Sequence, residues 1–224
     1  VRRQWWLVAL VIIVITLAAI ALRLWLHREP TALGGALAAR AASERDDGRR
    51  ETLWAELADG AEHDPGFRAA AAIELSQMLL VRGDAIKARE RAQQAENHAR
   101  SAKDDDLVLA AGLSRAAAAL DGGDAAGALD LYEKASRGAG AKHPARKLAA
   151  ELGAALCLEK LGKPAEAIAR LEPLTTRSDR GAEQVVQLAT AMYWRLKRAA
   201  EAAAPTEPAP AAESAPAPAA ESAP

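Results

Sequence analysis

LLVRGDAIKARERAQQA (79–95) recurs in altered form further along the chain, as ALDGGDAAGALDLYEKA (119–135) and LEKLGKPAEAIARLEPL (158–174). The three stretches align on a glycine, at positions 40 and 39 residues apart: Gly83, Gly123 and Gly162. Small or apolar residues stand five and twelve residues after each glycine: Ala88, Ala128 and Ala167, then Ala95, Ala135 and Leu174. Such a period indicates a repeat architecture, in which stacked units bury one continuous core.

Each glycine is expected to form a turn between two antiparallel helices. Asp84, Asp124 and Pro164 follow the turns, and Asp and Pro are typical of the first positions of a helix. Apolar residues recur before each turn at helical spacing: Phe67, Ala71, Leu75, Met78 and Leu79; Leu109, Leu113, Ala116, Ala117 and Leu120; Leu148, Leu152, Ala155 and Leu156. Asp104 to Asp106 and His143-Pro144 are predicted to begin the first helices of the second and third units.

This pattern resembles the tetratricopeptide repeat, in which a Gly-Asp turn precedes an alanine, an aromatic residue and a second alanine. The second unit matches best: Gly123, Asp124, Ala128, Tyr132 and Ala135. The aromatic position holds Ala92 in the first unit and Leu171 in the third. A small residue is expected midway along each first helix, and the chain has Ser76, Ala116 and Ala155 there. The resemblance implies an all-α solenoid of helical hairpins.

Further helices are predicted on both sides of the three repeats, which span residues 66–178. Residues 27–65 are expected to hold a linker and a weaker helical pair over 31–59, with a turn at Asp47-Gly48 that is followed by Leu53, Trp54 and Leu57 and closes at Pro65. Residues 179–203 are predicted to form a capping helix with one apolar face: Val185, Leu188, Ala189, Met192 and Leu196. Trp194 lies off that face and is either an exposed contact residue or packed under the following segment.

The segment WWLVALVIIVITLAAIAL (5–22) carries no charge, and apolar residues continue to Leu26. Because about 20 apolar residues span a bilayer, residues 5–26 are predicted to form a single transmembrane helix after a short end at 1–4. Positive charges favour a cytoplasmic N-terminus and place the repeats on the other side of the membrane. The alternative is a signal peptide cleaved after Ala21, which would release a secreted helical structural protein.

The last residues, 204–224, have a composition unlike the rest of the chain. They hold six of the eleven prolines and repeat APAAESAP in tandem, at 209–216 and 217–224. Such a segment cannot bury enough apolar surface to offset the entropy of ordering, so we expect a disordered, extended tail. The tail is interpreted as a spacer, with an adaptor-binding or wall-spanning role as the alternative.

The charge of the chain changes sign along its length. Residues 1–30 carry a net +3, residues 31–200 carry none and residues 201–224 carry −4, which together give the formal −1. A balanced middle lacks the clustered Lys and Arg of a nucleic-acid surface. The 59 alanines and few aromatic residues disfavour a sheet-based fold.

No set of residues has the spacing of a catalytic, cofactor or metal site, and we expect no enzyme activity, cofactor or small-molecule substrate. His63-Asp64 is the only adjacent acid–imidazole pair and is predicted to lie in a surface loop. Gly162-Lys163 lacks the remaining residues of a phosphate-binding loop. The single cysteine, Cys157, is expected to be an inert buried thiol.

The order of these parts, together with FRAAAAIELSQMLLVRGDAIKARERAQQA (67–95), is similar to the YfgM-like family, the ancillary subunit of the bacterial Sec translocon. The resemblance implies a single-pass protein of the bacterial inner membrane with a periplasmic repeat domain. Its partners would be translocon subunits and periplasmic chaperones. The alternative is a scaffold for another envelope assembly, in outer-membrane biogenesis, secretion, pilus formation or division.

Residues that bind a partner cannot be assigned from the sequence. A basic series around the first turn is interpreted as a solvated helix face, with an acidic partner as the alternative: Arg82, Lys87, Arg89 and Arg91.

Overall fold

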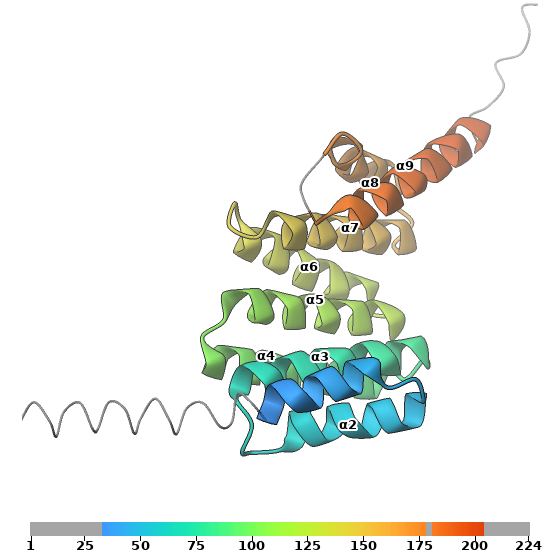
Figure 1. The fold of residues 1–224 in the computed structure, drawn as a ribbon. Helices are drawn as coiled ribbons and strands as arrows, with labels where there is room; N and C mark the ends of the chain where they lie inside the picture. Colours follow the sequence, from blue (N-terminus) through green and yellow to red (C-terminus); the bar gives the residue numbers. More distant parts are fainter. Residues whose placement is uncertain (1–32, 178–180, 204–224) are drawn as a thin grey trace, which may run out of the picture.

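The computed structural model describes residues 33–177 and 181–203, and every regular element within these ranges is helical (Figure 1). Residues 33–43 form the first described helical segment. The elements that follow are α2 (Asp47–Asp59), α3 (Pro65–Val81), α4 (Ala85–Ala102), α5 (Asp105–Asp121), α6 (Ala125–Ala139), α7 (Pro144–Lys160), α8 (Pro164–Leu171), the 3-10 turn η1 (Glu172–Leu174) and α9 (Glu183–Ala203). The predicted all-α class is therefore confirmed for the described residues.

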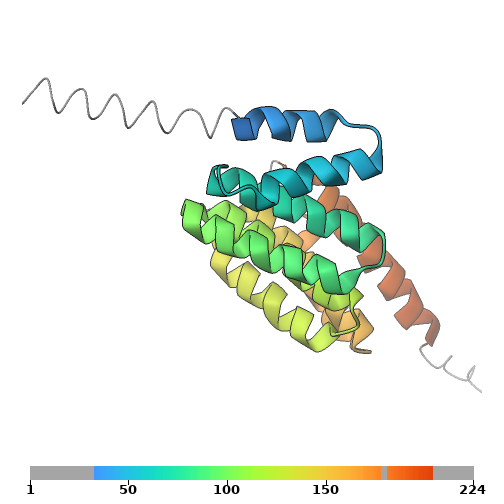
Figure 2. The ribbon, with the colours of Figure 1, turned by 90° about the horizontal axis from the view of Figure 1, so that it is seen from below.

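The three aligned stretches form helical hairpins, with α3, α5 and α7 as first helices and α4, α6 and α8 as second helices. Each first helix also contacts the next one, α3 with α5 and α5 with α7, and α7 contacts α9 in the same way. The last turns of α9 project beyond the other helices (Figure 2). Contacts between neighbouring units build a short solenoid of helical repeats.

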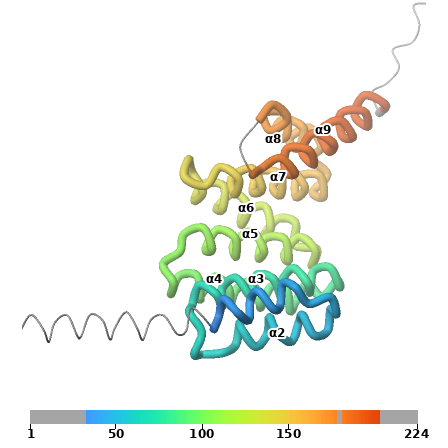
Figure 3. The backbone as a smooth tube through the Cα atoms, viewed as in Figure 1, coloured from blue at the N-terminus to red at the C-terminus, as the bar shows by residue number. Residues whose placement is uncertain are grey.

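The predicted glycine turns adopt a left-handed backbone. Gly83, Gly123 and Gly162 have φ values of 79°, 87° and 73°, a region that favours glycine. The amide after each glycine donates to a carbonyl near the end of the preceding helix at 2.9 Å: Asp84 to Leu79, Asp124 to Ala119 and Lys163 to Leu158. These bonds satisfy carbonyls that a helix end leaves free, so the chain reverses sharply into the second helix (Figure 3).

Residues after the turns begin the second helices as expected. The carboxylates of Asp84 and Asp124 accept hydrogen bonds from the backbone amides of Lys87 and Gly127. Pro164 occupies the first turn of α8. These are N-cap interactions and first-turn positions typical of helix starts, and they confirm the predicted helix boundaries.

Small residues let the two helices of each hairpin pack closely. Ser76, Ala116 and Ala155 of the first helices are fully buried. The alanines five residues after each glycine are fully buried as well: Ala88, Ala128 and Ala167. In the first hairpin, the Ser76 hydroxyl donates to the Ala88 carbonyl at 2.8 Å, which satisfies a buried polar group.

The segment before the repeats is also a helical hairpin, but its turn differs from the prediction. Asp47 and Gly48 lie in the first turn of α2, and the connection is formed by residues 44–46. Asp46 is the N-cap, and its carboxylate accepts from the Arg49 amide at 2.8 Å. Leu53, Trp54 and Leu57, which the sequence places in this pair, are buried.

Two leucines of the predicted apolar faces are exposed. Leu156 of α7 is 37% exposed and Leu188 of α9 is 60% exposed. Tyr193 takes the place of Leu188 in the core, beside Met192 and Leu196. The prediction was wrong because the core side of α9 is shifted around the helix from the face that counting apolar residues suggests.

The predicted transmembrane helix (5–26) and the predicted tail (204–224) lie outside the described residues. Of the helices within 33–177 and 181–203, none combines the length and the apolar character that crossing a membrane requires.

Candidate functional site

A cleft of about 430 Å³ opens on the face of the stack that the first helices form. We call it the first-helix cleft. Its apolar lining comes from α3, α5 and α7: Ala70, Ile73, Leu80, Leu107, Ala110, Leu113, Ala117 and Ala149. Its polar lining is Glu74, Gln77, Ser114, Tyr132 and Arg146.

The cleft repeats with the period of the sequence. Ala70, Ala110 and Ala149 stand at equivalent positions of the three first helices, 40 and 39 residues apart. Gln77 and Ala117 are likewise equivalent, and the next step of 39 residues leads to Leu156. Leu156 is therefore exposed because its position belongs to the cleft face of the repeat and not to the core.

Tyr132 reaches the cleft from α6, a second helix. Its ring packs with Ala116 of α5 and with Ala154 and Cys157 of α7, and only 7% of the residue is exposed. Gly153 of α7 leaves the space that the ring fills, since a Cβ atom there would lie closer than 3.0 Å to three ring carbons. Burial raises the pKa of the Tyr132 hydroxyl well above its usual range, so this group is a neutral hydrogen-bonding group.

An ion pair at one end of the cleft links two neighbouring repeats. The Arg146 guanidinium of α7 donates to both oxygens of Asp106 of α5, at 3.1 and 2.9 Å. His143 Nδ1 lies 3.2 Å from the same carboxylate. The hydrogen bond from Arg146 is the main reason why the pKa of Asp106 lies below its usual value of 3.8.

We expect this pair to make stability depend on acid pH. Because the folded pKa of Asp106 is lowered, its contribution is present above pH 3.8 and is lost as the pH falls through the lower, folded value. At neutral pH, Asp106→Asn should lower the free energy of unfolding by about 0.5–1 kcal/mol, the range of partly exposed pairs. Urea unfolding should show this difference vanishing in acid. A difference that does not shrink as the pH falls below 3.8, or an equal loss in the control Asp105→Asn, would contradict the assignment.

His63 and Asp64 do not form the pair that the sequence suggests. The Asp64 carboxylate caps α3 by accepting from the Gly66 amide at 2.8 Å. The His63 side chain is only 5% exposed, and neither ring nitrogen makes a hydrogen bond to another described residue. The predicted surface position is wrong for His63, because its ring packs tightly against Gly60 at the end of α2.

Other singled-out residues have structural roles in the described chain. Gly162 and Lys163 form the turn between α7 and α8. Asp104 caps α5 by accepting from the Leu107 amide at 3.0 Å. Asp105 and Asp106 lie in the first turn of α5, where negative charge is favourable.

Cys157 is fully buried between α5, α6 and α7, as predicted. Burial raises the pKa of its thiol to about 11. A thiolate is the reactive form of cysteine, and little of it exists near neutral pH at this pKa.

We therefore expect Cys157 to resist thiol reagents in the folded protein. At pH 8, a shift of the pKa from 9.0 to about 11 lowers the thiolate fraction about 100-fold, and burial slows the reaction further. Reaction with a disulfide reagent should therefore be at least about 100-fold slower in buffer than in concentrated urea. Equal rates would show that the thiol is accessible in the folded state.

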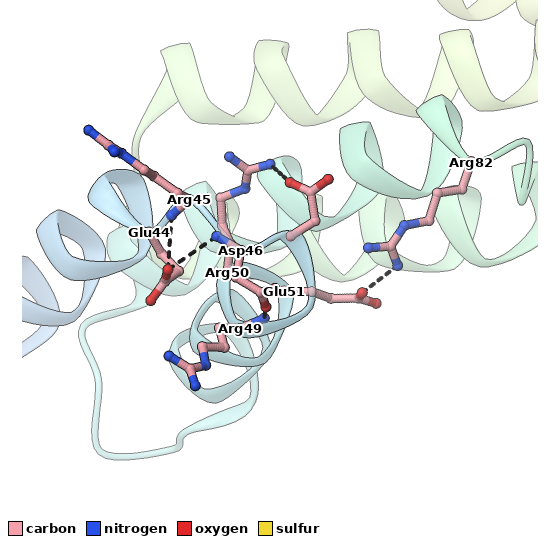
Figure 4. A network of polar contacts seen from close by, with 8 residues as sticks. Glu44, Arg45, Asp46, Arg49, Arg50, Glu51 and Arg82 are labelled. Atoms are coloured by element: carbon pink, nitrogen blue, oxygen red, sulfur yellow. Dashed lines mark hydrogen bonds and ion pairs between the residues drawn. The ribbon is translucent and has the colours of Figure 1, made fainter.

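The basic series around the first turn is largely neutralised within the chain. Arg82 pairs with Glu51 of α2, in a polar network at the start of that helix (Figure 4). Lys87 pairs with Asp84 at 2.9 Å. Arg91 pairs with Asp59 at 2.7 Å. These pairs tie α2, α3 and α4 together and leave Arg89 as the member of the series for which the described residues provide no ion pair.

Trp194 is half exposed on α9, at the opposite end of the array from α2. The first-helix cleft itself was not predicted. Its signal was present in the sequence, since Ala70, Ala110 and Ala149 recur at the repeat spacing beside the predicted apolar faces.

In comparisons with known proteins, no family model, curated protein or solved structure matches the chain. A search of the described residues for groups of three or more His, Cys, Asp or Glu side chains that could hold a metal ion finds none.

Proposed function

We propose that the protein is a non-enzymatic, membrane-tethered scaffold that binds a segment of a partner protein in the first-helix cleft. The cleft supports this proposal because it presents small and apolar side chains at equivalent positions of successive repeats. Of its lining residues, only Glu74 and Arg146 are charged, and Arg146 is held by Asp106. A surface of this kind suits a polypeptide segment with regularly spaced apolar side chains.

The proposed setting follows from the sequence. Residues 5–26 would anchor the chain in the bacterial inner membrane, with the N-terminus cytoplasmic and the repeats in the periplasm. The resemblance to the YfgM-like family suggests translocon subunits and periplasmic chaperones as partners. An apolar segment that emerges unfolded from the translocon has the chemistry that the cleft accepts.

Filling the cleft tests this function. Ala117 lines the middle of the cleft, whereas Ala169 is exposed on α8 and lies outside it. We expect Ala117→Arg to reduce co-purification of translocon subunits and periplasmic chaperones with the intact, membrane-extracted protein. The matched variant Ala169→Arg should retain them. Equal recovery with both variants would contradict binding in the cleft, and recovery of only division or outer-membrane assembly factors would contradict the proposed setting.

A further inference from the structure

Helix α9 is arranged like a first helix, and no second helix follows it within the part of the chain that the structure describes. It contacts α7 and α8, just as α7 contacts α5 and α6. In each preceding repeat, the segment that follows the first helix turns back and covers it. The segment that follows α9 is residues 204–224, which has six prolines and lies outside the described residues.

The repeat register extends into α9. A step of 39 residues, as between α5 and α7, carries Pro144 at the start of α7 onto Glu183 at the start of α9. The same step relates the buried residues of the two helices. Ala189, Met192, Tyr193 and Leu196 fall at the positions of Ala150, Gly153, Ala154 and Cys157, all buried in α7. The inner face of α9 therefore follows the repeat.

The outer face of α9 does not follow it. Leu148, Ala155 and Leu158 of α7 share a core with Ala167 and Leu171 of its second helix, α8. The equivalent positions of α9 hold Gln187, Trp194 and Lys197. Trp194 thus stands where the other first helices have their fully buried small residues: Ser76, Ala116 and Ala155.

An indole at this position changes what can cover the helix. Packed helices lie about 8–10 Å apart, and within a hairpin of this chain that approach needs a small residue. The Trp194 side of α9 instead presents a half-exposed indole, with the Lys197 ammonium 5.3 Å from its ring centroid. The Tyr193 ring meets the indole edge to face at 5.2 Å, but it is buried on the inner face of α9 and supports Trp194 from behind. Exposed aromatic side chains are the usual binding surface for proline-rich segments in the extended polyproline conformation.

Residues 204–224 have the matching chemistry. They contain three glutamates and no lysine or arginine, whereas Lys197 and Arg198 lie beside the exposed indole. The distance is short enough to bridge, since the nine residues from Trp194 to Ala203 rise about 14 Å along the helix and five extended residues span about 17 Å. We propose that the chain's own segment 204–224 folds back along α9 and binds the exposed Trp194 indole and the neighbouring Lys197.

Fluorine NMR of the full chain labelled with fluorotryptophan tests this contact. The chain has five tryptophans, and Trp194→Phe identifies the resonance of Trp194. Removal of residues 204–224 should shift this resonance by more than its line width. The resonance of Trp54, which is buried on α2 in the hairpin before the repeats, should stay in place as the internal control for folding. An unchanged Trp194 resonance would overturn the proposal.

A second variant tests whether the contact needs the prolines of the segment or only the presence of a chain of that length. Replacing its six prolines by serine keeps the length and the glutamates, and it should shift the Trp194 resonance as truncation does. A synthetic peptide of residues 204–224 should return the resonance of the truncated chain toward that of the full chain. The position in the full chain should not depend on protein concentration. A shift that grows with concentration would show that Trp194 binds the segment of a second copy and would contradict the folded-back arrangement.

Discussion

Gly153→Ala is expected to lower the free energy of unfolding by up to about 2 kcal/mol, although alanine is the better helix former. A Cβ at this position would overlap the buried Tyr132 ring, which packs between α5 and α7 and cannot move aside without disturbing both helices. Overpacking of this kind costs about 1–3 kcal/mol or more, against about 1 kcal/mol gained from helix propensity. Urea unfolding followed by circular dichroism measures the difference.

Two controls make the result specific to the Tyr132 contact. Gly112 lies in the middle of α5 with open space around its Cβ position, so Gly112→Ala should be neutral or stabilise by up to about 1 kcal/mol. In a Tyr132→Ala background, Gly153→Ala should also stabilise, because the ring that it meets is gone. If Gly153→Ala destabilises both backgrounds equally, the ring does not cause the loss.

Leu171→Ala should cost about 2–5 kcal/mol, the range for truncating a buried leucine. Leu171 is fully buried in the core that joins α7, α8 and α9. Helix α8 has only 8 residues, and Leu171 and Ala167 are its fully buried side chains. Thermal or urea unfolding of the full chain should show the loss, whereas Leu188→Ala, at a position 60% exposed, should change stability by less than about 0.5 kcal/mol. Similar losses for the two leucines would contradict the placement of this core.

Local features of the fold were predictable because their causes are local. A glycine with positive φ followed by a capping aspartate sets a turn, as at Gly123 and Asp124. Small residues at a fixed spacing marked the close contacts between helices, as at Ser76 and Ala88. None of these features depends on contacts between distant repeats.

Features that depend on several helices at once were not predictable in the same way. A first helix in this array packs on its own second helix and on the preceding repeat, so its buried residues form a broad, alanine-rich surface. Counting leucines at helical spacing therefore placed Leu156 and Leu188 inside, where the structure has them outside. Burial of His63 follows from the neighbouring Gly60, a contact that residue spacing does not reveal.

The candidate site could not be predicted from the sequence for a related reason. The first-helix cleft is made from one narrow strip of each first helix and from Tyr132, which reaches it through the gap at Gly153. Its residues are mostly alanines and leucines, types that predict a core as readily as a binding surface. Only the stacking of α3, α5 and α7 distinguishes the two.

Photo-crosslinking from inside the cleft in intact cells tests the scaffold function most directly. A benzophenone amino acid at position 117 would lie in the first-helix cleft, and the same group at position 169 would lie outside it on α8. We predict adducts with translocon subunits or periplasmic folding factors from position 117 and not from position 169. Equal labelling from the two positions, or adducts from position 117 with only outer-membrane assembly or division proteins, would contradict the account.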